Sequence, residues 1–297
     1  MRKPYVVERV LKPFQFALVA LGLWGCSLLN PGQDVPTYLV VPDVEYVPGE
    51  LQGTASSNIT DVWVYSATDV VGVFPLPAVV PLLPEDLSGG AVTLLAGIRE
   101  NGLSDRRAPY PFFTILEYYP EIEPGERDTL IPEPTLVENV RYVPIEDFEN
   151  SNVFGSLVGG EGVERVGDEG FVFEGLKSGR LEVAEGSELA RVRTVEQEYA
   201  LQINLPAFLE LDYRCDQTFI VGLYGFRNGQ ESQLPAMVLS PTDDGITPVW
   251  NKIYIDIASL VNAQGGADHF EVYVECVLEA GRSTGTVGLD NLRILTY

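Results

Sequence analysis

Short apolar runs interrupted by turn-forming residues are the feature that most restricts how this chain can fold. β-branched and aromatic residues cluster at 38–41, 59–65, 70–74, 91–98 and 110–119, and Pro, Gly or Asn separates these runs. None of this region carries a three-turn segment with an apolar stripe of 3.6-residue period. Runs of this length and composition are typical of strands. The pattern therefore predicts an all-β chain.

The second half of the chain repeats this pattern at a regular spacing. Its candidate strands lie at 171–173, 180–183, 200–205, 208–215, 219–226, 237–239, 252–257, 270–278 and 287–295. Short strands separated by Gly and Pro turns are typical of a sandwich or a jelly roll. Only 257–262 is expected to form a helical turn. In the first half, Asn101-Gly102 is a favoured hairpin pair, because both of its positions require positive φ.

These runs divide the chain into two β-domains. Residues 37–119 are expected to form a small β-sandwich, which resembles immunoglobulin-like or PEGA-like modules of secreted bacterial proteins. Residues 120–147 alternate Pro with Glu, and this composition predicts an extended, semi-rigid connector that can lend an edge strand to either domain. Residues 148–297 are expected to form a jelly-roll β-sandwich.

The first 25 residues have the layout of a secretory signal peptide. Arg2, Lys3, Arg9 and Lys12 precede an apolar run at 14–24, which is shorter than the roughly 20 residues that span a bilayer. The run ends in Leu23-Trp24-Gly25-Cys26, which resembles the lipobox of bacterial lipoproteins, although Trp24 departs from the usual pattern. The resemblance implies lipidation of Cys26, a tether over 26–36 and an outer-membrane location, on either the periplasmic side or the cell surface. The alternative is a plain signal peptide with an incidental Cys.

Charge and rare residues exclude several classes of function. The chain carries 43 acidic and 19 basic residues, a net charge of −24, and nucleic-acid binding requires clustered Lys and Arg instead. One His and three Cys exclude a His-rich zinc site and a four-Cys zinc site. No Gly-x-Ser-x-Gly, P-loop, dinucleotide-binding Gly motif or Cys-x-x-Cys is present. His269 is predicted to be a surface residue. The chain is predicted not to be an enzyme, with an acid-based hydrolase as the exception that so many carboxylates leave open.

Four segments of the second half resemble galactose-binding-like jelly rolls, a group that includes many carbohydrate-binding modules. They are residues 147–150 (Asp-Phe-Glu-Asn), 175–183 (a Ser-Gly turn leading into a strand), 250–257 (Trp-x-x-aliphatic-x-aliphatic-Asp) and 287–294 (a closing Asp-Asn strand). The resemblance implies a structural Ca²⁺, with Glu149 and Asp290 at its two carboxylate positions. The whole layout resembles Bacteroidota outer-membrane lipoproteins. Asp128-Thr129-Leu130 resembles the O-glycosylation motif of those bacteria, which makes Thr129 either a glycosylation site or an ordinary solvated Thr.

Polar and apolar residues alternate in the strongest strands of the second domain, as expected of half-buried antiparallel strands. If these strands share a sheet, their polar sides form one face, which consists of Asp212, Arg214, Tyr224, Tyr254, Asp256, Glu271, Tyr273 and Glu275. Aromatic rings can stack on sugar C–H groups, while carboxylates and Arg hold the hydroxyls. The face is therefore a candidate glycan site, and the alternatives are a protein-contact face or a plain solvated face.

Cys215 and Cys276 both fall on the apolar side of this alternation. The predicted location outside the cytoplasm permits a disulfide, although neighbouring strands offer poor geometry for one. The two are therefore either buried free thiols or a disulfide pair.

These observations favour a non-enzymatic outer-membrane lipoprotein that acts in adhesion, assembly or as an accessory subunit through protein contacts of its β-domains. Its partners would be the membrane, through the lipid anchor, and an envelope protein complex. The alternative is a glycan-binding lipoprotein of a polysaccharide-uptake system. No cofactor is expected apart from the Ca²⁺ that the resemblance implies.

Overall fold

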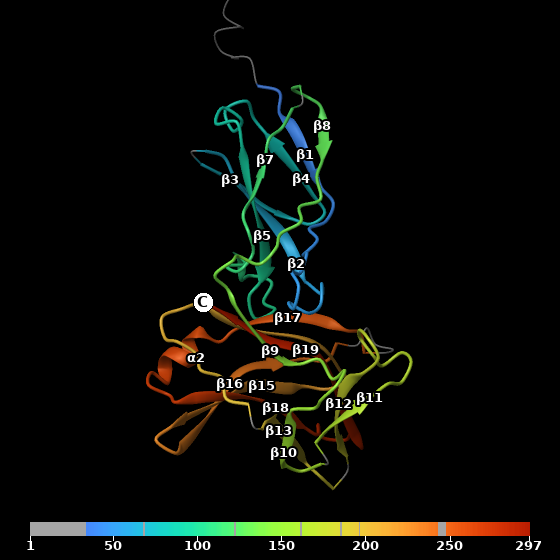
Figure 1. The fold of residues 1–297 in the computed structure, drawn as a ribbon. Coiled ribbons are helices and arrows are strands. Elements are labelled where there is room, and N and C mark those ends of the chain that lie inside the picture. The colour runs from blue at the N-terminus through green and yellow to red at the C-terminus, as the bar shows by residue number, and fades with distance from the viewer. Residues whose placement is uncertain are drawn as a thin grey trace, which may run out of the picture.

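The computed structural model describes residues 34–67, 69–121, 123–160, 162–184, 186–195, 197–242 and 248–297. The predicted signal peptide and Cys26 lie outside these ranges. The described chain is an all-β protein, as predicted, and its two β-domains are stacked end to end (Figure 1). Within these ranges no helix is long and apolar enough to span a membrane.

The first domain is a small sandwich of two sheets. One sheet contains β1 (Thr37–Val41), β4 (Ala78–Leu82) and β8 (Arg127–Thr129) in the order β4-β1-β8. The other contains β2 (Ile59–Tyr65), β3 (Val70–Pro75), β5 (Val92–Arg99), β6 (Arg107–Pro109) and β7 (Leu116–Tyr118). Alternate side chains such as Leu39, Val80 and Leu94 point inward and are fully buried or nearly so. Asn101 and Gly102 have the predicted positive φ and connect the antiparallel pair β5 and β6.

The Pro- and Glu-rich segment 120–147 lies against both domains. Its strand β8 pairs in parallel with β1, and the Tyr118 hydroxyl donates a 2.6 Å hydrogen bond to Asp128. Its later strand β9 (Arg141–Glu146) pairs with β19 (Thr284–Thr296) of the second domain. The segment therefore supplies one strand to each domain.

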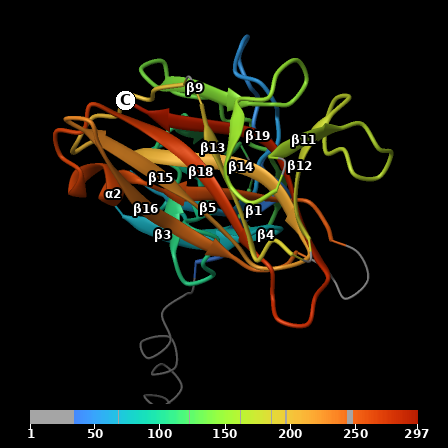
Figure 2. The same ribbon diagram turned by 90° about the horizontal axis from the view of Figure 1, so that it is seen from below.

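The second domain is a larger sandwich with two sheets. The domain-facing sheet, which lies against the first domain, has the order β11-β12-β19-β14-β17, with β9 also paired to β19. The open sheet, on the far side, has the order β10-β13-β18-β15-β16. Figure 2, seen from below, shows strands of the open sheet side by side. The strands are β10 (Phe154–Val158), β11 (Val163–Val166), β12 (Ser178–Ala184), β13 (Leu189–Thr194), β14 (Ala207–Cys215), β15 (Phe219–Arg227), β16 (Gln230–Leu239), β17 (Asn251–Asp256), β18 (His269–Val277) and β19.

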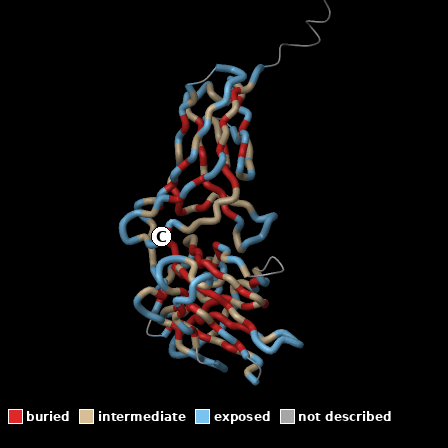
Figure 3. The backbone as a smooth tube through the Cα atoms, turned by 90° about the vertical axis from the view of Figure 1, so that its right-hand side faces the viewer, coloured by how far each residue is buried: buried red, intermediate tan, exposed pale blue. Residues whose placement is uncertain are grey.

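The core of the second domain lies between its two sheets, and Figure 3 shows buried residues along the strands of both domains. Leu211, Ile255 and Ile294 of the domain-facing sheet and Val221 and Val272 of the open sheet belong to one buried cluster. The helix α2 (Ala258–Ala263) follows β17 at the position where a helical turn was predicted.

Two of the predicted strands are wrong. Residues 171–173 form a turn region, in which the Phe171 amide donates to the Asp168 carbonyl and the Trp250 indole donates to the Phe171 carbonyl. Residues 200–205 form no strand, because Asn204 has a φ of 61° and its amide binds the side chain of Asn262. In both segments the aromatic or aliphatic composition reflects packing against the sandwich instead of strand pairing.

The two domains share a continuous apolar core. Phe208, Tyr254 and Leu295, which belong to the second domain, are buried in the same cluster as the core of the first domain. The Asn101 amide donates a 2.8 Å hydrogen bond to the Tyr254 carbonyl, and the Asn101 side chain accepts one of 2.9 Å from the Asp256 amide. The interface therefore fixes the orientation of one domain relative to the other.

Candidate functional site

The eight residues of the predicted binding face do not share a face. Asp212, Arg214, Tyr254 and Asp256 lie on the domain-facing sheet, whereas Tyr224, Glu271, Tyr273 and Glu275 lie on the open sheet. Each residue does point away from the core of the sandwich, so the predicted alternation within each strand is right. The prediction of one shared sheet is wrong, because alternation gives the side of a strand and not the sheet to which that strand belongs.

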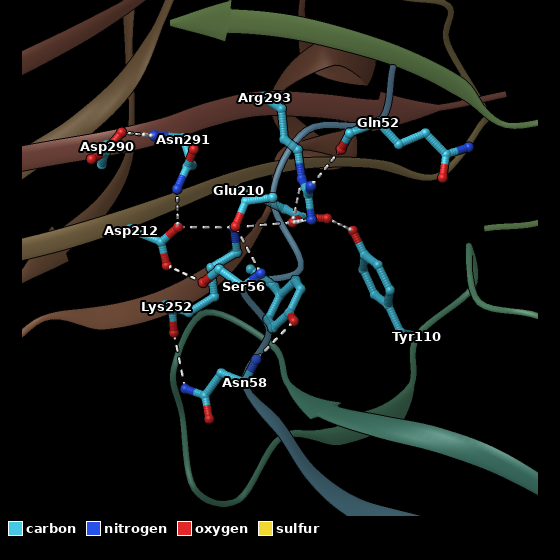
Figure 4. Close-up of polar contacts among 12 residues, drawn as sticks. Gln52, Ser56, Asn58, Tyr110, Glu210, Asp212, Lys252, Asp290, Asn291 and Arg293 are labelled. Carbon is cyan, nitrogen blue, oxygen red and sulfur yellow. Dashed lines mark hydrogen bonds and ion pairs between the residues drawn. The ribbon is translucent and has the colours of Figure 1, made fainter. Parts of the chain in front are cut away.

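The first domain covers most of the domain-facing group. Tyr254 is 1% exposed, its hydroxyl accepts a hydrogen bond from the Asn58 amide, and its ring lies 4.9 Å from that of Tyr110. Asp212 is fully buried and accepts a 2.6 Å hydrogen bond from the Ser56 hydroxyl (Figure 4). The Asp256 carboxylate accepts a hydrogen bond from the Ala258 amide at the start of α2. These three residues are therefore structural, whereas Arg214 borders a pocket.

A group of buried charges forms the polar centre of this interface (Figure 4). Glu210 is fully buried and pairs with Arg293 at 2.7 Å and with Lys252 at 3.4 Å, and it accepts a hydrogen bond from the Tyr110 hydroxyl of the first domain. Burial opposes ionisation of Glu210, but Arg293 and Lys252 together outweigh it and hold its pKa below the usual value. Burial also lowers the pKa of Lys252 and raises that of Asp212. The opposite charges compensate one another within the second domain, and the group contacts the first domain through hydrogen bonds with Tyr110, Ser56 and Gln52.

The two predicted calcium ligands already have protein partners. Glu149 accepts hydrogen bonds from the amides of Leu176 and Lys177, at 2.8 and 3.0 Å. Asp290 accepts a 2.6 Å hydrogen bond from the Ser178 hydroxyl, and burial raises its pKa to about 7. In the described part of the chain, no group of three or more His, Cys, Asp or Glu side chains is arranged to hold a metal ion. Calcium binding stays a prediction.

The outer face of the open sheet carries the other four predicted residues, together with two arginines that the sequence analysis did not single out. Arg193 on β13 pairs with Glu231 at 2.8 Å and with Glu271 at 3.0 Å. Its guanidinium lies 5.4 Å from the centre of the Tyr224 ring and 5.6 Å from that of Phe226. Arg191 pairs with Glu275 and approaches the Tyr224 hydroxyl at 3.4 Å. Tyrosine rings therefore lie among alternating guanidinium and carboxylate groups.

Tyr273 lies at the centre of this face. Its ring packs over Gly222, where a Cβ atom would come within 2.6 Å of the ring, so a side chain at 222 would displace the ring. Tyr273 is fully buried, and its hydroxyl has no hydrogen-bond partner. Gln233 lies near enough to influence the pKa of Tyr273, but its amide donates to Glu275 at 3.4 Å.

Unused hydrogen-bonding capacity is concentrated on this face. Five buried side-chain atoms of the described residues have no hydrogen-bond partner, and three of them are Arg193 Nε, Glu271 Oε2 and Tyr273 Oη. Arg193 Nε and Glu271 Oε2 attract each other as an ion pair, but they do not meet in hydrogen-bond geometry. Buried polar atoms without partners are costly, and they therefore mark candidate binding sites.

The remaining predicted residues lie apart from this face or at its edge. His269 is half-buried at one end, where it stacks on Phe226 at 4.5 Å, so it is not the plain surface residue that was predicted. Thr129 is exposed at the end of β8, and its glycosylation stays a prediction.

Cys215 and Cys276 are both buried, and they do not form a disulfide with each other. They lie on β14 and β18, that is, on the two facing sheets and not on neighbouring strands. Facing sheets are about 10 Å apart, whereas a disulfide needs Cα atoms within about 7 Å. Cys276 accepts a hydrogen bond from Gln217, and burial raises its pKa to about 11.

Similarity to known proteins is found only among solved structures. No protein-family profile and no curated protein sequence matches the chain. A family 29 carbohydrate-binding module mutant complexed with mannohexaose aligns at 10% identity over 53% of this chain and 92% of its own, with a TM-score of 0.35. A family 30 module gives 16% identity over 52% and 98%, with a TM-score of 0.39. A family 28 module described as specific for non-crystalline cellulose gives 13% identity over 50% and 90%, with a TM-score of 0.37.

Proposed function

We propose that the jelly-roll domain binds a glycan on the outer face of its open sheet and that the protein is not an enzyme. The observation that carries this proposal is the concentration there of buried polar atoms without a hydrogen bond: Arg193 Nε, Glu271 Oε2 and Tyr273 Oη. A sugar offers hydroxyl groups that both donate and accept, so one ligand can satisfy a guanidinium, a carboxylate and a phenol together.

The face is also held in place before any ligand arrives. The ion pairs of Arg191 and Arg193 fix the arginine and glutamate side chains, and Gly222 leaves the space that the Tyr273 ring occupies. Pre-positioned groups lose little conformational entropy on binding, which favours affinity. The first domain packs against the other sheet and so does not cover this face (Figure 1). Tyr224, Tyr273 and Glu275 are buried by neighbouring side chains, which a ligand would have to displace to reach them.

Protein contact is the second candidate function, and it was the first interpretation of the sequence. Exposed apolar side chains at the end of the first domain and on the connector favour it: Ile115 and Tyr119 are each 62% exposed, and Ile131 is 44% exposed. Under either function we propose attachment to the outer membrane through lipid on Cys26, which rests on the sequence motif alone.

A glycan array with the mature chain tests the glycan proposal. We expect Arg193→Gln to weaken binding of the polysaccharide that binds best by at least tenfold. The reason is that Arg193 pairs with Glu231 and Glu271, and its guanidinium also lies over the Tyr224 ring. We expect Tyr273→Phe to weaken binding without lowering stability, because its hydroxyl has no partner to lose in the free protein.

Arg107→Gln is the matched control. Arg107 forms a comparable ion pair with Asp61 at 3.0 Å, but it lies on β6 of the first domain, so this variant should bind as the wild type does. Absence of polysaccharide binding by the wild type would refute the proposal, as would equal binding by Arg193→Gln and Arg107→Gln.

A further inference from the structure

A second pocket lies on the domain-facing sheet, at the end that the first domain leaves uncovered. Its volume is about 300 Å³, at the small end of the range for ligand pockets. Thr286 and Gly288 of β19 form the floor, Arg180 and Glu182 of β12 one wall, and Arg214 and Asp216 the other wall, while Phe171, Cys215 and Pro248 complete the lining. We refer to it as the Phe171 pocket.

The position of the Phe171 ring is fixed on several sides. The guanidinium groups of Arg214 and Arg180 lie 4.9 and 5.8 Å from the ring centre, and the Trp250 indole donates a 3.0 Å hydrogen bond to the Phe171 carbonyl. Gly288 leaves the space for this arrangement, because a Cβ atom there would lie 2.6 Å from Arg214 Cγ and 3.1 Å from the Phe171 ring. The pocket therefore presents a rigid aromatic wall beside a guanidinium.

Arg214 differs from the other arginines around it. Arg180 pairs with three carboxylates, and Arg282 pairs with Asp216. Arg214 donates one 2.8 Å hydrogen bond to the Gly170 carbonyl and has no ion pair in the described chain. Burial lowers the pKa of Arg214, and the nearby Asp216 carboxylate opposes this shift without forming an ion pair with it. Most of its N–H donors are therefore available for an anion in the pocket.

We infer that the Phe171 pocket binds a sugar acid, with the hexuronate carboxylate on Arg214. A guanidinium prefers a carboxylate because two parallel N–H···O bonds form at once. The Glu182 and Asp216 carboxylates in the same lining accept hydrogen bonds, so the rest of the ligand must donate them, as ring hydroxyls do. This inference rests on the proposed glycan binding, but it assigns a different site and a charged sugar.

Titration calorimetry of the mature chain with glucuronate and galacturonate, and with glucose and galactose as neutral counterparts, tests the inference. We expect a sugar acid to bind at least tenfold more tightly than the neutral sugar of the same configuration. Arg214→Gln should abolish that difference. Gly288→Ala should weaken binding of the acid although the charge remains, because the new Cβ displaces Arg214. Circular dichroism melting confirms that each variant is folded.

The result that overturns the inference is equal affinity for acid and neutral sugars, no binding of any of the four, or retention of acid binding in a folded Arg214→Gln variant. Arg193→Gln separates this inference from the proposed function. It should reduce polysaccharide binding on the open sheet and leave uronate binding unchanged, because Arg193 lies on the opposite sheet from the pocket.

Discussion

Replacement of Glu210 by Gln is the most informative test of how the two domains are held together. Glu210 is fully buried and compensates two buried cations, Arg293 at 2.7 Å and Lys252 at 3.4 Å. Gln preserves the volume but removes the charge, so Arg293 is left in the interface without a counter-charge and Lys252 keeps only Asp212, at 3.7 Å. Removing one partner of a buried ion pair typically costs about 3–5 kcal/mol. Because burial already lowers the pKa of Lys252, this residue can release its proton, which favours the lower end of that range.

The assay can follow each domain by its own tryptophan. Trp63 lies on β2 of the first domain, and Trp250 lies just before β17 of the second. Urea unfolding of the Trp63→Phe and Trp250→Phe backgrounds reports the two domains separately. We expect both transitions to weaken by about 3 kcal/mol in Glu210→Gln, and the melting temperature to fall by roughly 10 °C.

Glu231→Gln is the control for this prediction. Glu231 also pairs with an arginine, at 2.8 Å, but its side chain is 54% exposed, and such surface pairs are worth about 0–1 kcal/mol. A loss of less than 1 kcal/mol in Glu210→Gln would refute the argument that the buried charges hold the interface. A loss confined to one tryptophan would refute the argument that the interface couples the domains.

Two further predictions concern pH and thiol chemistry. Because burial raises the pKa of Asp290 to about 7, the folded protein keeps a proton that the unfolded chain has released between about pH 4 and 7. Stability is therefore lost as pH rises through this window, by at most about 1.4 kcal/mol per unit, and Asp290→Asn should remove the loss in urea titrations with chelator present. Repeating the urea titration with Ca²⁺, together with a thermal melt, tests the predicted calcium site. A melting temperature that Ca²⁺ leaves unchanged would contradict the predicted site. With a pKa of about 11, Cys276 is about one part in a thousand thiolate at pH 8, so we expect no alkylation of Cys276 in the native protein and full alkylation of Cys276 in denaturant. Mass spectrometry showing a thiol blocked in denaturant would contradict this prediction.

The sequence was sufficient to predict the all-β class and the side on which residues of the strongest strands face. Strands such as β14 and β18 alternate strictly, and alternation follows directly from strand geometry. The strand β13 was missed because it has Arg191 and Arg193 at its outward positions and only a short apolar sequence between them. Asn228-Gly229, both with positive φ, was a usable signal for the hairpin of β15 and β16 and was not used.

The candidate site was only half predictable. Which strands become neighbours depends on contacts between residues far apart in the chain, so the eight predicted residues were assigned to one sheet although they lie on two. The exposed appearance of Tyr254 and Asp212 in the sequence was misleading for the same reason. Their polar sides face the first domain, and the local sequence pattern of a strand cannot predict which other domain will cover it.

The shared core between the domains also determines how the open sheet is presented. The described chain begins at the end of the first domain farthest from the jelly roll (Figure 1). Since Phe208, Tyr254 and Leu295 are buried within the core of the first domain, that domain acts as a rigid spacer and not as a flexible linker. The open sheet therefore keeps a fixed distance and orientation relative to the end of the first domain at which the described chain begins, and it faces away from that end (Figure 1).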